Sequence, residues 1–495
     1  MRILHVASEV APWAQTGGLA DVVAALPAAV AAQSASVTNA IVVPLHRGVV
    51  ERVAAAGRTL DDPGVVVTAD LAGATWHGRF RVLADGASPI WFLECPPLYD
   101  RDGLYGPATG GDHPDNAVRF AFLCRAAVDH GARIMSGVPD VLHVHDWQAG
   151  LAAAYLRTSA GAGADARRRT GTVCTVHNLA FRGVFPKAMV PALGLPWSAF
   201  TMQRFEFWDQ LSTLKAGLAF ADAATTVSPS YAHEIMTPEL GEGLHDFLRW
   251  HVPRLVGIVN GIDTTVWDPA TDPAIAASFS AAAPAGKARC RAALAADAGL
   301  AIEDTTLLVG MVSRLTHHKG VDLVAELVPE LAAAGAKLVV LGSGEPTLED
   351  RLRWLAARFR DHFALRLGFD PAMARRIYAG ADAVLVPSRF EPCGLTQLYA
   401  MRYGAVPIVH AVGGLRDTVH DPGDLALAGG GGTGIRFDQA DAIAMQAAVA
   451  RAARLFREHA GWQRIVLAAM RRDSSWGPSA REYLQLYRAV VRERQ

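Results

Sequence analysis

The sequence has 495 residues, of which 51% are hydrophobic, and it carries 47 basic against 48 acidic side chains. This length predicts two or three domains with sizeable cores, and the near-zero net charge does not favour nucleic acid or an anionic membrane as a partner. Five scattered cysteines without a CxxC pair, no signal-peptide pattern and no uncharged apolar run of about 18 residues predict a reduced, cytoplasmic protein that does not span a membrane.

Apolar runs rich in β-branched residues recur through the first half of the chain and predict strands. They lie at residues 2–8 (RILHVAS), 39–45 (NAIVVPL), 89–95 (PIWFLEC), 140–147 (DVLHVHDW), 171–178 (GTVCTVHN) and 223–230 (AATTVSPS). The stretch 19–33 (LADVVAALPAAVAAQ) follows the first run and predicts a helix. Continuously apolar strands separated by helices are typical of a parallel sheet that is covered on both faces.

The second half of the chain repeats this pattern. Strands are expected at 306–315 (TLLVGMVSRL), 336–344 (AKLVVLGSG), 382–389 (DAVLVPSR) and 405–414 (AVPIVHAVGG), and helices at 289–300, 321–335, 398–405 and 479–494. The stretch 257–275 contains Asn-Gly and two Asp-Pro pairs and predicts a loop between the two sets. The sequence therefore predicts two doubly wound α/β domains, which favours a ligand site in a cleft beyond the carboxyl ends of the strands.

Polar and charged side chains follow several of the predicted strands. They are the glycine turn 16–18 with Asp21 behind it, His177 with Asn178, Arg314 with Lys319, and Glu391 before a glycine that opens a helix. Arg314 and Lys319 supply two cations, and a helix that begins near residues 394–396 offers free N–H groups, so together they describe a diphosphate site. Glu391 could accept hydrogen bonds from sugar hydroxyls. The alternative is a surface ion-pair set, which is common and weak, but several clusters at strand ends favour a binding site.

Three weaker patterns point to structure more than to function. Residues 429–434 (GGGGTG) have the spacing of a dinucleotide-binding loop, but they precede IRFD instead of a helix, which favours a flexible loop. His143 and His145 lie on one side of a strand, as metal ligands do, but no third ligand has matching spacing, which favours core or cleft histidines. Residues 106–116 and 161–169 are typical of surface loops, the second with a short basic run at 167–169.

A set of motifs in a fixed order carries a resemblance to a known family. They are TGGLADVVAALP, HVHDWQAGL, TVHNLAFRGVF, STLKAGLAFAD, TVSPSYAHEI, VNGID, SRLTHHKG and SRFEPCGLTQLYAMRYG followed by GGLRDTV. Over essentially the whole chain, the sequence resembles bacterial glycogen synthases and plant starch synthases. This resemblance implies the GT-B architecture, in which two Rossmann-like domains, here 1–258 and 259–477, face a cleft and the last helix, 478–495, packs back on the first domain.

The resemblance also implies a reaction. Glucose would pass from ADP-glucose to the non-reducing 4-OH of glycogen or another α-1,4-glucan, with retention of configuration and without a metal or other cofactor. A double displacement would need two carboxylates about 5 Å apart. No second carboxylate suits that role, and Tyr399 stands where related retaining transferases often carry a glutamate. The resemblance implies a front-face reaction instead, in which the departing phosphate helps to deprotonate the acceptor.

Individual roles follow from the same resemblance. Arg314 and Lys319 match the pair that neutralises the nucleotide diphosphate, whose charge grows in the transition state. Glu391 matches the residue that holds the donor glucose hydroxyls, His177 a histidine at the reacting sugar, and Asp146 a residue of the donor and acceptor cleft. The further expected substrate-binding positions are Gln15, Gly17, Gly18, Asp21, Tyr105, Asn260, Cys393, Gly394, Leu395 and Thr396. Trp147 is either a platform for a glucose ring or a core residue.

This sequence departs from the family pattern at a few positions. Gln15 replaces the usual lysine of KTGG, His318 stands where glutamine is typical, and Arg416 where alanine is typical. The loss of the lysine charge puts donor identity and rate in doubt, unless another cation such as Arg416 compensates. Three alternatives therefore stay open: UDP-glucose as donor, glucose-1-phosphate or a short oligosaccharide as acceptor, or a glucan-binding paralogue with little catalysis.

Overall fold

The chain divides into two compact units. The structure, a computed structural model, describes all residues except 85, 87, 108–109, 159–168 and 495. The first unit comprises Met1–Gly261 and Trp476–Gln495, and the second comprises Ile262–Ser475. Both units are α/β with parallel strands, so the predicted fold class is confirmed. The predicted basic run at 167–169 lies almost wholly outside the described residues, as do 108–109 of the predicted loop 106–116.

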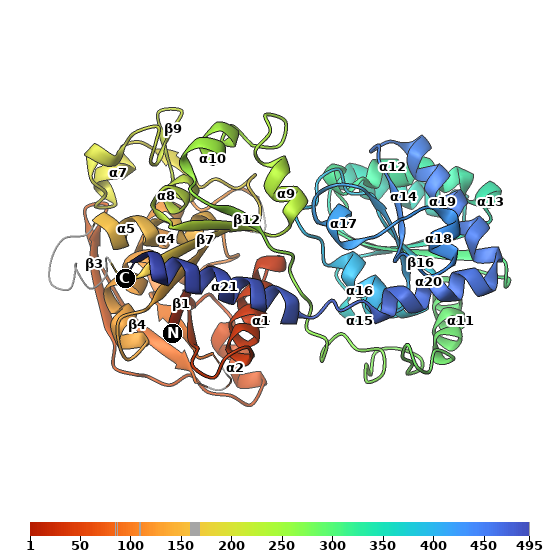
Figure 1. The fold of residues 1–495 in the computed structure, drawn as a ribbon, viewed down its shortest axis with the longest axis horizontal. Helices are drawn as coiled ribbons and strands as arrows, with labels where there is room; N and C mark the ends of the chain where they lie inside the picture. Colours follow the sequence, from red (N-terminus) through yellow and green to blue (C-terminus); the bar gives the residue numbers. More distant parts are fainter. Residues whose placement is uncertain (85, 87, 108–109, 159–168, 495) are drawn as a thin grey trace. The chain divides into compact units, whose positions relative to one another are not determined.

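A largely parallel sheet forms the centre of the first unit (Figure 1). Its strands in spatial order are β12 (Leu255–Gly257), β11 (Ala223–Thr226), β7 (Gly171–Val176), β6 (Val141–His145), β1 (Arg2–Val6), β2 (Thr38–Pro44), β5 (Ile90–Glu94), β4 (Ala74–Leu83) and β3 (Val66–Leu71). The strands from β12 to β5 pair in parallel, and they include all six predicted runs. A small second sheet has the order β8 (Val184–Pro186), β10 (Gln210–Ser212) and β9 (Glu206–Phe207).

The antiparallel hairpin of β3 and β4 was not predicted. Its two-residue turn, Ala72-Gly73, has positive φ at both positions, as a type I′ hairpin turn requires. Asn-Gly and Asp-Gly are the sequences that usually mark such a turn, and Ala-Gly gives no comparable signal. β3 also exposes part of its length, so its apolar pattern is weak.

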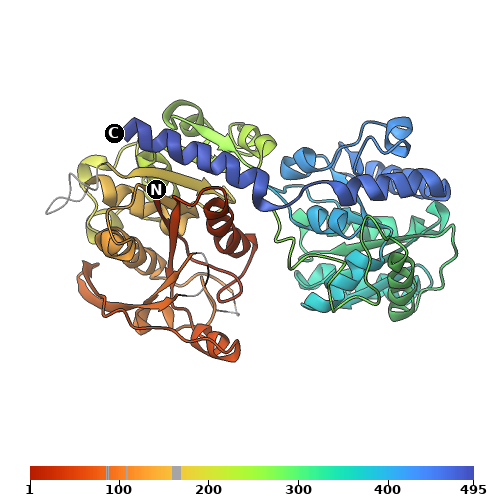
Figure 2. The same ribbon diagram turned by 60° about the horizontal axis from the view of Figure 1, so that its bottom comes forward.

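Helices flank the sheet of the first unit. They are α1 (Gly18–Ala32), α2 (Val49–Ala55), α3 (Pro96–Tyr99), α4 (Asn116–Ile134), α5 (Asp146–Thr158), α7 (Met189–Ala192), α8 (Thr213–Phe220), α9 (Pro229–Glu234), α10 (His245–His251) and α21 (Trp476–Arg494). The last of these, α21, lies beside α1 and packs on the sheet through Tyr483, Tyr487 and Val490 (Figure 1 and Figure 2). Thus a segment from the far end of the chain completes the core around Ile3.

Two glycines let α5 and α8 approach closely. A Cβ at Gly150 would lie 2.1 Å from the carbonyl oxygen of Thr213, and a Cβ at Gly217 would lie 2.9 Å from the Cα of Gly150. Any side chain there would push the helices apart. These glycines belong to the motifs HVHDWQAGL and STLKAGLAFAD, so part of the family resemblance reflects helix packing.

The second unit has its own parallel sheet. Its strands in spatial order are β15 (Phe363–Leu367), β14 (Ala336–Gly342), β13 (Leu307–Val312), β16 (Ala383–Val386), β17 (Val406–His410) and β18 (Ile435–Phe437). Its helices are α11 (Gly286–Ala298), α12 (Val321–Leu327), α13 (Leu331–Ala334), α14 (Pro346–Arg358), α15 (Pro371–Gly380), α16 (Thr396–Arg402), α17 (Gly413–Thr418), α18 (Asp424–Ala428), α19 (Ala442–Arg457) and α20 (His459–Arg471).

Some predictions for the second unit need correction. The helix expected at 321–335 is broken at Val328–Glu330, where Pro329 lacks the N–H of a helix interior. The strands β15 and β18 were not predicted, and half of β15 is exposed or polar. The glycine run 429–434 lies between α18 and β18, which is the reverse of the strand-to-helix order of a dinucleotide loop.

Two features bear on the environment of the protein. All five cysteines are buried and free. Among the described residues, no helix combines the length and the apolar character that a membrane crossing requires.

Candidate active site

The carboxyl ends of β6 and β7 bring Asp146 and His177 into contact. Asp146 directly follows β6 and begins α5, and His177 directly follows β7. The Oδ1 atom of Asp146 accepts a hydrogen bond of 2.7 Å from the backbone N–H of His177. Asp146 has a φ of +56°, a left-handed conformation that aspartate tolerates better than most residues. The backbone is thus shaped to present this carboxylate at the strand ends.

Burial sets the charge states of this pair. Burial raises the pKa of Asp146 to about 7, although hydrogen bonds from the backbone of His177 and Asn178 oppose the shift. Burial also lowers the pKa of His177 to about 3, so its imidazole is neutral near pH 7. His177 is only half-buried, so part of its ring can reach a ligand. A carboxyl group that titrates near neutrality beside a neutral imidazole is typical of a functional site.

Glu9, which the sequence analysis did not single out, organises the opening glycine turn. Its Oε2 atom accepts hydrogen bonds from the backbone N–H groups of Thr16 (2.5 Å) and Gly17 (3.4 Å), and its Oε1 atom accepts one from Thr16 Oγ1 (2.7 Å). The hydroxyl of Tyr105 donates to the same carboxylate and lies 2.7 Å from Ser8 Oγ. Glu9 therefore joins the turn to Tyr105. A charged residue just after an apolar strand was the signal that could have found it.

Gln15 contacts Asp21 within the same turn. Its Nε2 atom donates a hydrogen bond of 3.2 Å to Asp21 Oδ2. Burial raises the pKa of Asp21 to about 6, the hydrogen bond from Gln15 lowers it, and the charge of Glu9 raises it. Lysine at position 15 would instead place a cation beside Asp21.

Gly17 is not required by the fold. Its φ of −163° is an extended conformation open to any residue, and a Cβ there would meet no atom within 4 Å. The expected close approach of a ligand to the backbone at this position stays a prediction. Gly18 follows as the first residue of α1.

Gly17→Ala is therefore expected to leave the folded state intact and to weaken substrate binding. We expect an unchanged thermal midpoint and a KM for the sugar donor raised by about tenfold or more, since the added methyl group would meet the ligand. Gly150→Ala is the matched control, because its Cβ would meet the carbonyl of Thr213 at 2.1 Å. It should lower the thermal midpoint. Equal donor KM values for Gly17→Ala and the natural protein would contradict the role given to Gly17.

Two further predicted positions of the first unit are buried. Trp147 is 8% exposed, and its ring packs edge-on against Phe120 at a centroid distance of 5.0 Å. Of the two roles left open for Trp147, the structure supports the core residue. Asn260 is also buried, and its covered Oδ1 atom has no hydrogen-bond partner among the described residues, while its predicted contact with a ligand stays a prediction.

The second unit joins Lys319 to Glu391. Lys319 Nζ donates to Glu391 Oε2 over 2.5 Å, and the two side chains are 20% and 12% exposed. Ser388 Oγ donates to the same oxygen over 2.8 Å. Arg314 is exposed, and its side chain forms no hydrogen bond or ion pair with any described residue. Lys319 and Glu391 thus form an ion pair that is largely buried and not on the surface, and Arg314 takes no part in it.

Hydrogen bonds and close packing hold the loop after Glu391 in place. Gly394 has a φ of +71°, which favours glycine, and α16 begins two residues later at Thr396, as predicted. The side chain of Gln397 donates to the carbonyl oxygens of Cys393 (3.0 Å) and Gly394 (2.8 Å). A Cβ at Gly414 would lie 2.2 Å from the Cys393 carbonyl oxygen, so α17 packs directly on this loop. Leu395 lies between Gly394 and the first residue of α16, and it is half-buried.

The positions that depart from the family pattern have identifiable surroundings. Both Nε and Nη2 of Arg416 donate to the carbonyl oxygen of Ala411, over 3.0 and 2.7 Å. His318 is exposed, and its pKa is lowered by partial burial and by the charge of Lys319. Tyr399 stacks on Trp267 at a centroid distance of 3.8 Å, so its ring supports the core beneath α16.

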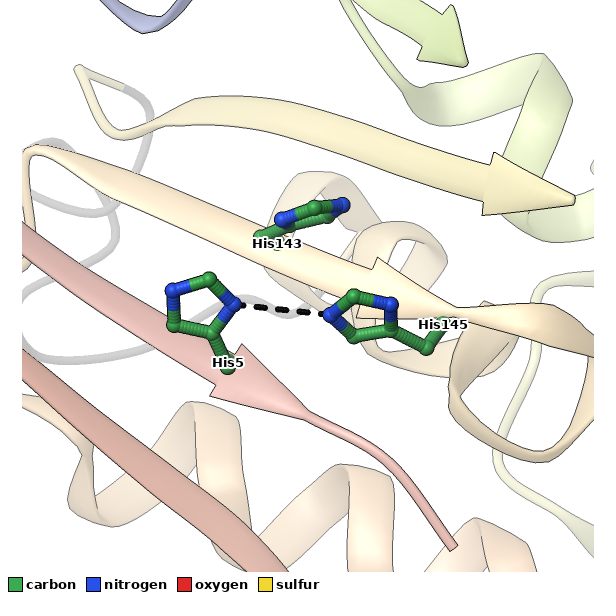
Figure 3. A group of neighbouring side chains, drawn as sticks. All are labelled: His5, His143 and His145. Atoms are coloured by element: carbon green, nitrogen blue, oxygen red, sulfur yellow. Dashed lines mark hydrogen bonds between the residues drawn. The ribbon is translucent and has the colours of Figure 1, made fainter. Parts of the chain in front are cut away.

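Figure 3 shows a cluster of three buried histidines, and one of them, His145, contacts His177. His5 from β1 joins His143 and His145 from β6, and one nitrogen of each ring lies within 4.8 Å of the others. The sequence analysis found no third metal ligand beside His143 and His145. His5 takes that position, because it is far from them in the sequence but lies on the neighbouring strand. The ring nitrogens already have partners: His143, for example, contacts Tyr487 OH (2.8 Å) and Thr175 Oγ1 (2.6 Å). A metal ion here would have to displace these hydrogen bonds.

The two α/β units and the side chains at their strand ends define a glycosyltransferase with the GT-B fold. The family Glycosyl transferases group 1 matches residues 295–456, and the family Starch synthase catalytic domain matches residues 2–250. A sucrose-phosphate synthase from Thermosynechococcus elongatus, 18% identical, shares the fold over 99% of both chains with a TM-score of 0.57.

Closer relatives narrow this class. A glycogen synthase from Anaeromyxobacter dehalogenans (strain 2CP-C) is 48% identical over 99% of this chain and 100% of its own, and one from Methylocella silvestris is 45% identical over 99% of both. The catalytic domain of starch synthase IV from Arabidopsis thaliana, bound to ADP and acarbose, is 32% identical over 99% of both chains, with a TM-score of 0.87. The chain belongs to the glycogen and starch synthase family of glycosyltransferases.

Proposed function

We propose that the protein is an active glycogen synthase that transfers glucose from ADP-glucose to the non-reducing 4-OH of an α-1,4-glucan with retention of configuration. The observation that carries this proposal is the likeness along the full chain to a starch synthase whose solved structure holds ADP and acarbose. Glycogen synthases at 48% and 45% identity add to this support. These matches cover 99% of this chain, so both units are included.

Charge supports a nucleoside diphosphate sugar as the donor. Arg314 has no anionic partner among the described residues, and Lys319 uses one of its three N–H donors for Glu391. Both cations can therefore stabilise the negative charge that grows on the departing diphosphate. Glu391 is held by Lys319 and Ser388 and keeps its other oxygen for the hydroxyls of the donor glucose.

Asp146 and His177 would act at the reacting sugar. Glycosyl transfer passes through an oxocarbenium-like transition state, and an ionised Asp146 would stabilise its positive charge. Glu9, whose carboxylate charge acts on Asp146, already accepts hydrogen bonds from Thr16, Gly17 and Tyr105. This supports a front-face reaction without a covalent glucosyl-enzyme. Asn260 and Tyr105 are proposed to complete the substrate contacts of the first unit, and Cys393 and Thr396 those of the second.

The same proposal includes the absence of a metal requirement and a cytoplasmic location. Two cations and the N–H groups before α16 supply the stabilisation that a metal would otherwise provide. Five buried, free cysteines suit a reducing compartment. Activity should therefore persist in excess EDTA, and loss of activity that Mg²⁺ or Zn²⁺ restores would contradict this part.

The experiment measures release of ADP or UDP from the corresponding glucose donor, with glycogen present, for the natural protein and for Gln15→Lys. We expect brisk ADP release by the natural protein and at most a few-fold change in KM for the variant, because the hydrogen bond from Gln15 already orients Asp21. Activity in the lysine variant alone would identify a weakened synthase. Preference for UDP-glucose would overturn the proposed donor, and glycogen binding without nucleotide release would support a glucan-binding paralogue.

A further inference from the structure

Two histidines of the cluster, His5 and His145, belong to a line of hydrogen bonds that crosses four neighbouring strands. Asn39 on β2, His5 on β1 and His145 on β6 lead to His177, which follows β7. Asn39 Oδ1 lies 3.3 Å from His5 Nε2, His5 Nδ1 lies 3.4 Å from His145 Nε2, and His145 Nδ1 lies 3.1 Å from His177 Nε2. The link between His5 and His145 is drawn in Figure 3.

All three imidazoles are neutral near pH 7. Burial lowers the pKa of His5 to about 4 and that of His177 to about 3, and it lowers the pKa of His145 well below its ordinary value. A neutral imidazole carries one N–H and one acceptor nitrogen. Each of the three rings therefore has one nitrogen that donates and one that accepts. Because a ring that donates to one neighbour must accept from the other, every ring in the line donates in the same direction.

Asn39 decides which direction that is. Its Nδ2 atom donates a hydrogen bond of 2.9 Å to the carbonyl oxygen of Pro27, which can only accept. This bond fixes the orientation of the amide and turns Oδ1, an acceptor, toward His5. His5 must then carry its proton on Nε2 and accept at Nδ1. In turn, His145 donates from Nε2 and accepts at Nδ1, so His177 donates from Nε2.

We propose that Asn39, His5 and His145 are positioning residues that set the tautomer of His177, with its proton on Nε2 and with Nδ1 as an acceptor for the substrate. Nδ1 of His177 has no hydrogen-bond partner among the described residues, and the residue is half-buried. A sugar hydroxyl at this nitrogen must donate its proton to it. The role of His177 at the sugar rests on the proposed function, whereas the tautomer rests on the hydrogen bonds alone.

The first test records long-range ¹H–¹⁵N spectra of the full-length protein labelled with ¹⁵N-histidine, without substrate, at pH 7.5. Single histidine substitutions assign the signals. We expect His5, His145 and His177 each to show a protonated Nε2 and an unprotonated Nδ1. A protonated Nδ1 in any of the three, or zinc bound at one equivalent in the purified protein, would overturn the proposal.

The second test compares Asn39→Leu with Asn39→Asp. Leucine removes the acceptor for His5 Nε2, so the opposite direction of donation becomes accessible. Aspartic acid keeps it, because its carbonyl oxygen accepts from His5 while its hydroxyl donates to the Pro27 carbonyl. We expect signals of protonated Nδ1 in His177 and a kcat lowered about tenfold for Asn39→Leu, from the loss of one buried hydrogen bond. Asn39→Asp should keep the natural tautomer and a kcat within about twofold.

These outcomes separate the relay from a structural role and from the proposed reaction. Equal losses of kcat in both Asn39 variants, with unchanged histidine spectra, would mean that Asn39 only stabilises the fold and would overturn the relay. Expected spectra in a natural protein that releases no ADP would leave the tautomer assignment standing and would contradict the proposed function instead.

Discussion

Lys319→Ala is expected to lower kcat for glucose transfer from ADP-glucose by about 10³-fold, the loss typical for one donor that stabilises transition-state charge. It should also destabilise the fold, because it leaves the carboxylate of Glu391, 12% exposed, without its cation. Steady-state ADP release and urea unfolding measure the two effects separately.

The double variant Lys319→Ala with Glu391→Gln distinguishes these effects. It removes both charges, so the free energy of unfolding should recover most of its loss while activity stays low. Arg314→Ala should lower kcat by about 10²-fold without a change in stability, since its side chain has no partner among the described residues. Arg353→Ala, which breaks ion pairs with Glu349 and Asp350 on α14, is the control for loss of an exposed arginine. An active Lys319→Ala enzyme would show that the ion pair is structural only.

Asp146→Asn is expected to lower activity and raise stability at the same time. With the pKa of the natural residue raised to about 7, kcat should fall as pH drops through 7 and the carboxylate takes up a proton. Asparagine keeps the Oδ1 acceptor for the N–H of His177 and tolerates the positive φ. Its kcat at pH 8 should be about 10²-fold lower, and the decline near pH 7 should disappear.

The stability change of this variant has a definite sign. A carboxyl group whose pKa is raised by folding stabilises the folded state fully below its unfolded value near 4, and this contribution is lost as pH rises to about 7. Asp146→Asn should therefore have a free energy of unfolding about 2–4 kcal/mol higher than that of the natural protein at pH 8, and the difference should be smaller at pH 5. Urea unfolding at the two pH values measures both differences. An Asn variant that is less stable at pH 8, or natural activity with no decline near pH 7, would contradict the ionised role of Asp146.

The apolar runs predicted the parallel strands that hold the site, and they did so because buried parallel strands need uninterrupted apolar residues. They did not predict the hairpin of β3 and β4, because β3 is partly exposed and the turn between the two strands lacks a usual turn sequence. They also did not predict the strand β15, whose last two residues are exposed. Asp146, His177 and Glu391 could be placed at strand ends for the same reason that the strands could be found. Their functional roles stay predictions, which the variants above test.

Glu9 shows where sequence reasoning stopped. It precedes the glycine turn in the sequence, but only the folded chain brings its carboxylate to Thr16, Gly17 and Tyr105. Gly150 and Gly217 are a second case. No side chain fits at either position, because α5 and α8 cross there in close contact. Neither the contacts of Glu9 nor the close approach of the two helices produces a recognisable pattern in the neighbouring sequence.

By itself, the sequence determined the fold class, the family and the strand ends at which charged side chains gather, because these depend on local apolar patterning and on contiguous motifs. Only the tertiary structure decided which of those side chains meet. Lys319 reaches Glu391 across 72 positions, and His5 meets His145 across 140. Such pairs depend on the order of strands in a sheet, and that order is set by packing over the whole unit.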